Sequence, residues 1–529
     1  MLHEAAYYMR MSLGVYRLFR ARSISDPERT VLDQMANREQ SFLKTVQNTI
    51  FANPENPYNR MFQLAGCSFG DLEQGVNRDG LESTLTGLHR AGVYLSHDEF
   101  KCKKPIVRSG QTIASNHASF LNPLVSGSFE SRSGGSRSVG TITRQNLRNQ
   151  LYRECYHSFM SREWDLKHRA FVGLMPILPA SWGLGHCLQA ARRGNPAERW
   201  FAIGGTMRNS GHYRAVTKAL VILAKALGAK VPFPSYLKPD DFSPAAEWIA
   251  GRLQEGIPSW VSGLVSPCVR VAAVALEKGL DIRGTIFRAG GEALTDAKRR
   301  VFESAEAEVL PNYHINELGL IGQACRQMNK GNCIHIQRDA VAVISYRRKA
   351  PLTDYEVNSL LFTSLLPFAT RVLVNVEMDD AGVLDRARCD CIYQRAGFVD
   401  QLSEIYSYGK LTGQGITIVG GDVVRILEEI LPQRFGGVPG DYQIVEEEAS
   451  LQTQVLLRVS PRVGVASIEA IKETFLREVR KLYGGSAAGR QWQHTGAVKV
   501  VIGEPYVTSS GKVLCLHLLG PMTGDKHES

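Results

Sequence analysis

Apolar residues recur at helical spacing along the first part of the chain. Tyr7, Met11, Tyr16 and Phe19 are separated by several arginines, which is the pattern of an amphipathic helix with a basic polar face. Such a helix can lie on a membrane surface, but helices of this kind more often cover the core of their own domain. We therefore predict a helical segment over residues 1–56 that packs on the rest of the protein.

Helix and strand patterns alternate through the middle of the chain. The spacing of apolar residues predicts helices at 216–229 and 267–278. Short runs rich in β-branched residues predict strands at 285–287, 340–344 and 372–376. Alternation of this kind is typical of an α/β architecture.

A stretch rich in Gly and Thr, residues 406–421, separates this region from the end of the chain, and such a break is typical of a linker. Beyond it, the pattern predicts a strand at 454–459, a helix at 467–482 and a strand at 498–502. At 529 residues the chain is also longer than a single core supports. We predict four segments, namely a helical segment 1–56, a large domain 57–405, a hinge 406–413 and a small domain 414–529.

The composition narrows the class of protein. Hydrophobic residues make up 44% and charged residues 22%, which is ordinary for a soluble globular protein. No apolar stretch approaches the roughly 20 residues that a membrane-spanning helix needs, and Glu4 and Arg10 stand where an export signal would be apolar. Ten cysteines without an export signal indicate reduced thiols. We expect a cytoplasmic protein with no membrane span.

The net charge of +10 is spread along the chain rather than gathered in one tract. This disfavours a nucleic-acid-binding protein, which usually concentrates its charge on one face. A positive field suits polyanionic ligands, although a basic solvated surface without a ligand explains the charge equally well.

Residues 131–141 form a Ser-, Gly- and Arg-rich break between polar segments. Successive backbone N–H groups in such a loop, together with Ser and Arg side chains, make a cradle for phosphate oxygens. Loops of this composition are often only flexible turns. The motifs that follow it in order carry more information, and they are Gly290-Gly291-Glu292, then the segments 312–317 and 377–380, and finally Ser510-Gly511-Lys512.

In this order the motifs resemble the signature of the adenylate-forming enzymes, which include acyl-CoA synthetases, firefly luciferase and the adenylation domains of peptide synthetases. The likeness looks strongest to the phenylacetate–CoA ligase branch, and it runs from about residue 57 to the end of the chain. It implies an α/β fold with a large N-terminal adenylating domain of several subdomains and a small, mobile α+β C-terminal lid. It also implies that ATP and Mg²⁺ activate a carboxylic acid, an aromatic one by the family's example, to an acyl-adenylate. The acyl group then passes to a thiol, with coenzyme A as the first choice.

The resemblance assigns roles to the residues of the ATP site. The phosphate loop corresponds to Ser133, Gly134, Gly135, Ser136 and Arg137, where Arg137 supplies the charge that a lysine provides in many relatives. Glu317 matches the magnesium ligand, and Tyr313 matches the aromatic residue that packs on adenine. His314 and Asn316 depart from the family's usual Gly and Thr or Ser, although Asn still offers hydrogen bonds to a phosphate or carboxylate oxygen.

Further positions complete the expected site. Gly290, Gly291 and Glu292 match a segment beside adenine, and Asp380 matches the carboxylate that binds the ribose hydroxyls, with Asp379 as a one-residue alternative. Lys512 matches the catalytic lysine that counters charge at the α-phosphate. In the hinge, Lys410 and Thr412 stand where the family often has Arg and Asp. Trp260, Ser262 and Gly263 lie where the acid pocket would begin, and they suggest a medium, partly apolar acid; a plain core position is an equal explanation for Trp260.

Two groups of cysteine and histidine flank these motifs. Some phenylacetate–CoA ligase relatives have a similar pairing that binds structural zinc, and the corresponding ligands here are Cys325, His335, Cys389 and Cys391, with Cys333 as a substitute for either of the first two. Thiolate and imidazole are the ligands that zinc prefers. Reduced, buried cysteines without a metal are the alternative.

Two other functions stay open at this point. The first is an adenylating enzyme with a different acceptor, such as a carrier-protein thiol, a protein cysteine, an amine or a hydroxyl. The second is a non-catalytic nucleotide-binding protein, which the departures at His314, Asp379, Lys410 and Thr412 would suit.

Overall fold

The computed structural model describes residues 2–519 with internal gaps. The gaps are 126–128, 133–141, 204–210, 239–240, 329–331, 350–355, 408–411, 414–415, 418–419, 450–451, 465–466, 482–497 and 509–510. The expected phosphate-loop residues Ser133, Gly134, Gly135, Ser136 and Arg137 therefore lie outside the described residues. The same is true of Lys410 in the expected hinge and of Ser510.

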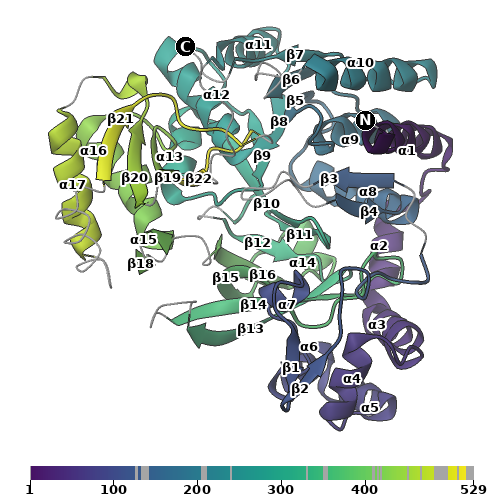
Figure 1. The fold of residues 1–529 in the computed structure, drawn as a ribbon. Coiled ribbons are helices and arrows are strands. Elements are labelled where there is room, and N and C mark those ends of the chain that lie inside the picture. Colours follow the sequence, from purple (N-terminus) through teal and green to yellow (C-terminus); the bar gives the residue numbers. More distant parts are fainter. Residues whose placement is uncertain are drawn as a thin grey trace.

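A twelve-stranded sheet forms the centre of the molecule (Figure 1), in the order β13-β14-β15-β16-β12-β11-β10-β9-β8-β5-β6-β7. The strands from β10 to β7 in this order pair in parallel, and they are β5 (Ala170–Pro176), β6 (Arg199–Ile203), β7 (Pro234–Tyr236), β8 (Ser259–Leu264), β9 (Ile286–Gly290) and β10 (Glu308–Ile315). Every residue of β5 and β8 is buried. This explains the continuous apolar run of β5, because helices cover both faces of a parallel sheet.

The other half of the sheet is antiparallel. Its strands are β11 (Gly319–Gln323), β12 (Ile334–Ile336), β13 (Val341–Lys349), β14 (Glu356–Ser364), β15 (Val376–Arg386) and β16 (Asp400–Ser407). Since β10 pairs in parallel with β9 and antiparallel with β11, the two halves meet at β10.

Helices pack on the parallel half of the sheet. They are α8 (Leu147–Glu163), α9 (Trp182–Arg192), α10 (Gly211–Ala226), α11 (Ser243–Gln254), α12 (Val265–Lys278) and α13 (Asp296–Ser304). Residues 265–275 of α12 are all buried, and they share a hydrophobic cluster with α11 and with β5, β8 and β9. The predicted helices at 216–229 and 267–278 are confirmed as α10 and α12.

The N-terminal helices are α1 (Leu2–Arg20), α2 (Pro27–Ala36) and α3 (Arg38–Val46), followed by the π-helical turn η1 (Gln47–Phe51). Tyr7, Met11, Val15 and Leu18 bury one face of α1 in the same hydrophobic cluster as α10 and β5. The predicted helical segment that covers the core is therefore confirmed.

Four more helices and two hairpins complete this part of the chain. They are α4 (Pro57–Leu64), α5 (Phe69–Asp79), α6 (Leu81–Arg90), α7 (His97–Phe100), β1 (Ile106–Arg108) with β2 (Gln111–Ile113), and β3 (Phe129–Arg132) with β4 (Ile142–Gln145). Helices α3 to α7 pack against the antiparallel half of the sheet through one hydrophobic cluster. The short helix α14 (Ile392–Arg395) precedes β16.

The predicted strand at 372–376 is wrong. Residues 372–374 are buried in the hydrophobic cluster of helices α3 to α7, and Asn375 is buried beside it, but none of these residues forms a strand, and β15 begins only at Val376. Asn375 adopts a φ of 50°, and its side-chain amide donates to the carbonyl oxygens of Leu85 and Val93. The β-branched residues before it therefore reflect burial rather than strand pairing.

The C-terminal part, residues 412–519, forms a smaller α+β unit on the left of Figure 1. Its four-stranded sheet has the order β21-β20-β19-β22, with bounds β19 (Tyr442–Ala449), β20 (Gln452–Val459), β21 (Val498–Ile502) and β22 (Leu516–Leu519). The other elements are β17 (Thr412–Gly413), β18 (Ile416–Thr417), α15 (Gly420–Arg425), η2 (Ile426–Ile430), α16 (Leu431–Phe435), η3 (Pro461–Val463) and α17 (Ile468–Lys481). The expected α/β fold with a large first part and a small α+β second part is confirmed, whereas the exact domain boundaries stay a prediction.

Two buried ion pairs join the C-terminal part to the rest of the chain. Arg270 on α12 lies 2.9 Å from Asp441, and Lys298 on α13 lies 2.8 Å from Glu428. Each buried hydrophobic cluster of the described residues, by contrast, belongs to one side of this interface alone. The contact between the two parts is therefore largely polar.

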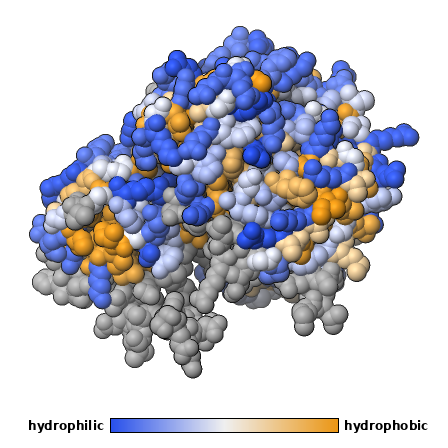
Figure 2. Space-filling model, turned by 90° about the horizontal axis from the view of Figure 1, so that it is seen from above, coloured by the Kyte–Doolittle hydropathy of each residue, from blue (hydrophilic) through white to orange (hydrophobic). Residues whose placement is uncertain are grey.

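The face drawn in Figure 2 is mostly hydrophilic, with apolar residues gathered in separate patches. Among the described helices, none combines the length and apolar character needed to cross a bilayer.

Candidate active site

Lys512 pairs with Thr508 at the base of a tight turn in the C-terminal part. Its backbone N–H donates to the Thr508 hydroxyl at 3.0 Å, and the Thr508 N–H donates back to the Lys512 carbonyl at 2.9 Å. Gly511 has a φ of 89°, and a Cβ there would lie 2.8 Å from Ile203 at the end of β6. The turn therefore needs glycine, both for its backbone and for its approach to the large sheet.

The Lys512 side chain lies beside Gly291, directly after β9. A Cβ on Gly291 would stand 3.5 Å from Cε and 3.6 Å from Nζ of Lys512. Gly290 is just as confined, because a Cβ there would stand 2.5 Å from the Asn312 side chain. The absence of a side chain at Gly291 thus lets Lys512 pack against the backbone, and the absence of one at Gly290 makes room for Asn312.

Glu292 is half-buried next to this contact, with its Oε1 atom shielded from solvent. The Ser266 hydroxyl contacts the Glu292 carboxylate and also lies 3.2 Å from the carbonyl oxygen of Val513. Burial raises the pKa of Glu292, while the nearby Lys298 and Lys512 act in the opposite direction. Glu292 therefore joins the glycine segment to the Lys512 turn rather than facing open solvent.

Tyr313 and Asp380 meet across the sheet. The Tyr313 hydroxyl on β10 donates to the Asp380 carboxylate on β15 at 2.5 Å. Burial and the Asp380 charge raise the pKa of Tyr313 well above its ordinary value. Asp379 points elsewhere, with its carboxylate 3.1 Å from His97 Nδ1 on α7 and its backbone at a φ of 60°. The two neighbouring aspartates thus have different surroundings, and Asp380 is the one that lies with Tyr313.

Glu317 forms an ion pair with Lys101, with 2.5 Å between Nζ and Oε1. Its side chain is only 9% exposed. Lys101 follows α7, whose start is fixed by a capping box between Ser96 and Glu99. Lys101 could not be recognised from the sequence, because the Ser-x-x-Glu pattern reveals a helix start but not the distant partner of the residue after the helix.

His314 and Asn316 lie on the same segment as Tyr313. His314 Nε2 accepts a hydrogen bond from Arg153 on α8 at 2.6 Å. Gly319 lies next to the same guanidinium, since a Cβ there would stand 3.6 Å from Arg153 Nε. Asn316 is half-buried between His314 and Glu317. The histidine that departs from the family pattern therefore makes contact with an arginine.

Trp260 and Ser262 line a pocket between β5, β8, β9 and the helices α8 and α9. Its volume is about 580 Å³ including the open mouth. Trp260 stacks on Phe171 with ring centroids 4.1 Å apart, and Ser262 Oγ lies 3.5 Å from His186 Nδ1. Gly263 lies behind the pocket wall, where a Cβ would meet Cys268 Sγ at 2.8 Å. The expected acid-pocket residues therefore lie at a real cavity, but most of its polar lining was missed.

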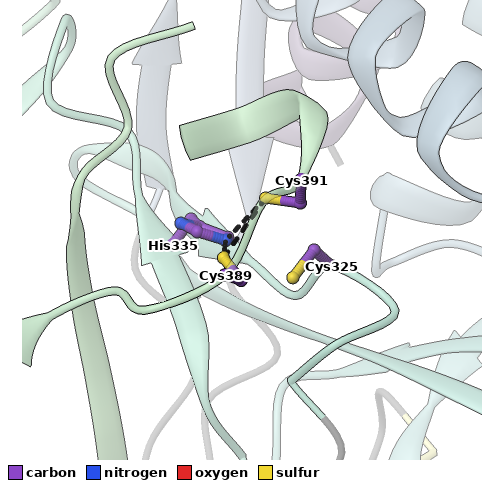
Figure 3. Close-up of side chains that lie close together, drawn as sticks. All are labelled: Cys325, His335, Cys389 and Cys391. Atoms are coloured by element: carbon purple, nitrogen blue, oxygen red, sulfur yellow. Dashed lines mark hydrogen bonds between the residues drawn. The ribbon is translucent and has the colours of Figure 1, made fainter. Parts of the chain in front are cut away.

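Cys325, His335, Cys389 and Cys391 form a compact cluster (Figure 3), and their ligand atoms all lie within 4.8 Å of one another. His335 Nε2 is 3.4 Å from Cys389 Sγ and 3.2 Å from Cys391 Sγ. His335 Nδ1 lies 2.8 Å from the Phe398 carbonyl oxygen. That contact assigns the proton to Nδ1 and leaves Nε2 free to bind a metal, as second-shell partners of zinc-binding histidines do.

The donor set fits a tetrahedral zinc site, with three thiols and one imidazole. The Cys325 thiol, the largest influence, lowers the pKa of Cys391, and His335 acts in the same direction. Cys333 is not part of this cluster, so the expected substitute ligand is not needed. Zinc binding itself stays a prediction.

Comparisons with known proteins bear on the fold. No protein-family model matches the chain, and no curated protein does. Among solved structures, 2-hydroxyisobutyryl-CoA ligase in its postadenylation state matches over 94% of this chain and 90% of that chain, with 15% sequence identity and a TM-score of 0.50. ATP-bound MatB from Rhodopseudomonas palustris matches over 76% and 68% of the two chains, with 12% identity and a TM-score of 0.40.

A third solved structure is O-succinylbenzoate coenzyme A synthetase (MenE) from Bacillus subtilis with ATP and magnesium ion. It matches over 81% of this chain and 80% of that chain, with 11% identity and a TM-score of 0.38. The match to 2-hydroxyisobutyryl-CoA ligase, which covers nearly both chains, confirms the expected resemblance at the level of fold. It does not single out the phenylacetate–CoA ligase branch.

Proposed function

We propose that this chain, whose fold is that of the adenylate-forming ligases, activates a carboxylic acid with ATP and passes the acyl group to a thiol. In the first half-reaction, a carboxylate oxygen of the acid attacks the α-phosphorus of ATP. A bond forms between that oxygen and phosphorus, the bond to the β-phosphate oxygen breaks, and pyrophosphate leaves. The second half-reaction transfers the acyl group from the adenylate to sulfur and releases AMP.

Lys512 is the proposed catalytic residue of the first half-reaction. Negative charge grows around the α-phosphorus as pyrophosphate leaves, and a fixed ammonium group lowers the energy of that transition state more than that of the bound substrates. The position of Lys512 beside Gly291 supports this role, because the glycine lets the ammonium group lie against the backbone of the segment that is expected beside adenine. This contact is the observation that carries the proposal.

Tyr313 and Asp380 are the proposed adenosine-binding pair. An aromatic ring offers a stacking surface to adenine, and a carboxylate accepts hydrogen bonds from both ribose hydroxyls. The 2.5 Å hydrogen bond between the two side chains supports this pairing, because it brings both groups to one place on the sheet.

Glu317 would hold Mg²⁺, which supplies charge neutralisation at the phosphates when bound. Lys101 contacts only Oε1 of this carboxylate, so a metal would bind through the other oxygen or displace the lysine. The hard carboxylate oxygen is the ligand type that magnesium prefers.

For the second half-reaction, we propose that the C-terminal part turns about residues 406–413 and withdraws Lys512, which opens a path for coenzyme A. Domain rotation is an established way for one site to run two steps in order. The polar interface through Arg270 and Lys298 supports such a motion, because interfaces of this kind resemble transient ones. A carrier-protein thiol or another acceptor is the alternative for this step.

Pyrophosphate exchange into ATP, measured with a panel of carboxylic acids, tests the proposal. We expect exchange that depends on both the acid and Mg²⁺. Adding coenzyme A, and then a phosphopantetheinyl carrier protein, an amine or a hydroxyl compound, identifies the acceptor. A protein that binds ATP but supports no exchange with any acid would be the non-catalytic alternative.

A further inference from the structure

Five basic side chains converge on the pocket behind the candidate active site. They come from three elements and their ends, and they are Arg153 and His157 on α8, His186 on α9, Arg193 just after α9, and Arg288 on β9. The remaining lining is neutral, and no acidic side chain lines the pocket within the described part of the chain. An acid-binding pocket of this composition is unusual, because such pockets are mostly apolar.

The three arginines have no carboxylate partner among the residues that the structure describes. None of them forms one of the ion pairs of that part of the chain, and the Nε atoms of Arg193 and Arg288 are buried without a hydrogen-bond partner. The charge of Glu154 acts on Arg193, but the ion pair of this carboxylate is with Arg192, at a distance of 3.1 Å. Buried donors without a partner cost stability, so a ligand that accepts their hydrogen bonds would offset that cost.

The pocket carries a net positive charge at neutral pH. Burial, the largest cause, lowers the pKa of Arg153, Arg193 and Arg288 to about 10 each, and this still leaves all three protonated. Burial and the arginines hold the pKa of His157 and His186 well below the ordinary value, so both histidines are neutral. The cations repel one another, since Arg153 and Arg193 both act on Arg288. An anion between them would remove that repulsion.

The pocket also connects to the site of the proposed chemistry. Arg153 contacts His314, which follows Tyr313. The same histidine is close enough to Lys512 and Arg288 for their charges to influence its pKa. A ligand that reaches from the pocket past His314 would therefore present one end to the arginines and the other end to the Lys512 side of the site.

We propose that the acid activated here carries a second anionic group, a carboxylate or a phosphate-like group, which Arg153, Arg193 and Arg288 bind inside the pocket. This inference rests on the proposed function. The reacting carboxylate lies at the Lys512 end, and the apolar walls from Phe171, Trp260 and Met160 contact the carbon chain between the two anions. A partly apolar acid, as expected from the sequence, would account for the apolar walls of the pocket but not for its arginines. Arginine is suited to the role because its planar fork binds carboxylate and phosphate with two hydrogen bonds.

The test compares acids that differ only in the second charge. Pyrophosphate exchange is measured with dicarboxylic acids of three to six carbons, with their half-methyl esters, and with phosphonocarboxylic acids of matching length. We expect kcat/KM to be at least on the order of 10-fold higher for a diacid or phosphonocarboxylate than for its half-ester, as losing a charge-assisted hydrogen bond predicts. The diacid and phosphonate series identify which anion the pocket takes.

Substitutions assign the effect to the arginines. Arg288→Gln and Arg193→Gln should lower kcat/KM for the preferred dianionic acid by on the order of 10- to 100-fold and leave the half-ester nearly unchanged. Arg199→Gln is the matched control, because Arg199 is exposed at the start of β6 and carries the same charge. Should Arg288→Gln fail to fold, Arg288→Lys keeps the charge, and it should retain part of the preference.

The outcomes separate this inference from the proposed function. Exchange with monocarboxylates that exceeds exchange with every dianionic acid would overturn the inference and leave the proposed function standing. An equal loss of kcat/KM for the diacid and the half-ester in the arginine variants would indicate that these side chains bind ATP or the acceptor instead. That result would also overturn the inference. If no acid supports exchange, calorimetric titration of the wild type and Arg288→Gln with the same diacids still decides it, because dianion binding that depends on Arg288 supports the pocket, and its absence rejects it.

Discussion

Gly291 and Lys512 are packed so closely that any side chain at position 291 would touch the lysine. A Cβ there would lie 3.5 Å from Lys512 Cε and only 2.9 Å from Leu264 Cδ2, on a backbone with a φ of 78°. The contact joins two segments that are far apart in sequence and belong to different sheets. It fixes where the ammonium group of the C-terminal part meets the large sheet.

We expect Lys512→Ala to lower acyl-adenylate formation by at least two orders of magnitude, roughly the loss seen when one electrostatic stabiliser is deleted. Transfer from a supplied acyl-adenylate should be largely intact, because the ammonium acts only while charge builds at phosphorus. Single-turnover measurements of each half-reaction check this. Lys472→Ala on α17 is the control. Equal loss in both half-reactions would contradict the assignment.

Glu317→Gln should weaken the response of the adenylation rate to Mg²⁺ and slow that step by about two orders of magnitude. The amide keeps the size of the side chain but loses the charge that a divalent cation and Lys101 share. Rates measured across a magnesium titration give both effects, with the exposed Glu303→Gln as control. An unchanged magnesium response would show that other residues bind the magnesium ion.

The ribose role of Asp380 predicts that Asp380→Asn raises the KM for ATP by on the order of 10- to 100-fold, since hydrogen bonds to a charged acceptor are the strong ones. Tyr313→Phe keeps the ring and loses only the hydroxyl, so its effect should be several-fold smaller. Asp379→Asn serves as the neighbouring control, because Asp379 faces His97 instead. A larger KM effect at position 379 than at 380 would reverse the assignment of the two carboxylates.

Elemental analysis of protein purified without chelator or a metal-affinity tag should find about one zinc per chain, as a closed four-ligand site predicts. Cys389→Ser and Cys391→Ser should lower the zinc content and the melting temperature, whereas Cys333→Ser, outside the cluster, should keep both. Chelator should destabilise the wild type but not the zinc-free variants. Well under one zinc per chain in the wild type would reject the site.

Asp339 predicts a pH-dependent stability. It is buried, its carboxylate accepts hydrogen bonds from Tyr152 and Tyr156, and burial raises its pKa from 3.8 to about 6. Between these two pH values the folded protein holds a proton that the unfolded chain has released, so stability falls as the pH rises from about 4 to about 6. At about 1.4 kcal/mol per pH unit, the loss reaches about 3 kcal/mol above pH 6.

Asp339→Asn removes this titration. Relative to the wild type, the variant should therefore gain about 3 kcal/mol in unfolding free energy between pH 4 and pH 7. Urea denaturation at both pH values measures the difference, and the exposed Asp165→Asn is the control. Parallel stability profiles for the wild type and Asp339→Asn would show that the carboxyl group has an ordinary pKa.

Local patterns in the sequence predicted the elements that depend on local periodicity. The helices at 1–56, 216–229 and 267–278 have long apolar stripes, and the structure contains them. The run at 372–376 was misread because β-branched residues report burial as well as strand pairing, and the turn at Asn375 depends on partners in distant segments.

The same distinction between local patterns and distant partners applies to the residues of the candidate site. Gly290, Tyr313, Asp380 and Lys512 could be recognised because they lie in short ordered motifs. The pocket arginines could not, because each arrives from a different element and no motif surrounds them. Lys101 is separated from Glu317 by 216 positions, so only the folded chain brings the two together.

Two buried ion pairs between helices α12 and α13 and the C-terminal part bear on how firmly the C-terminal part is held. Arg270–Asp441 and Lys298–Glu428 are buried, and the energy gained from each pair is offset in large part by the cost of removing its charges from water. On separation, water would solvate the same four groups at little net cost, whereas an apolar seam would resist exposure in proportion to its area. If the C-terminal part turns as proposed, we therefore expect small differences in ligand affinity between the two arrangements to be enough to shift the equilibrium between them.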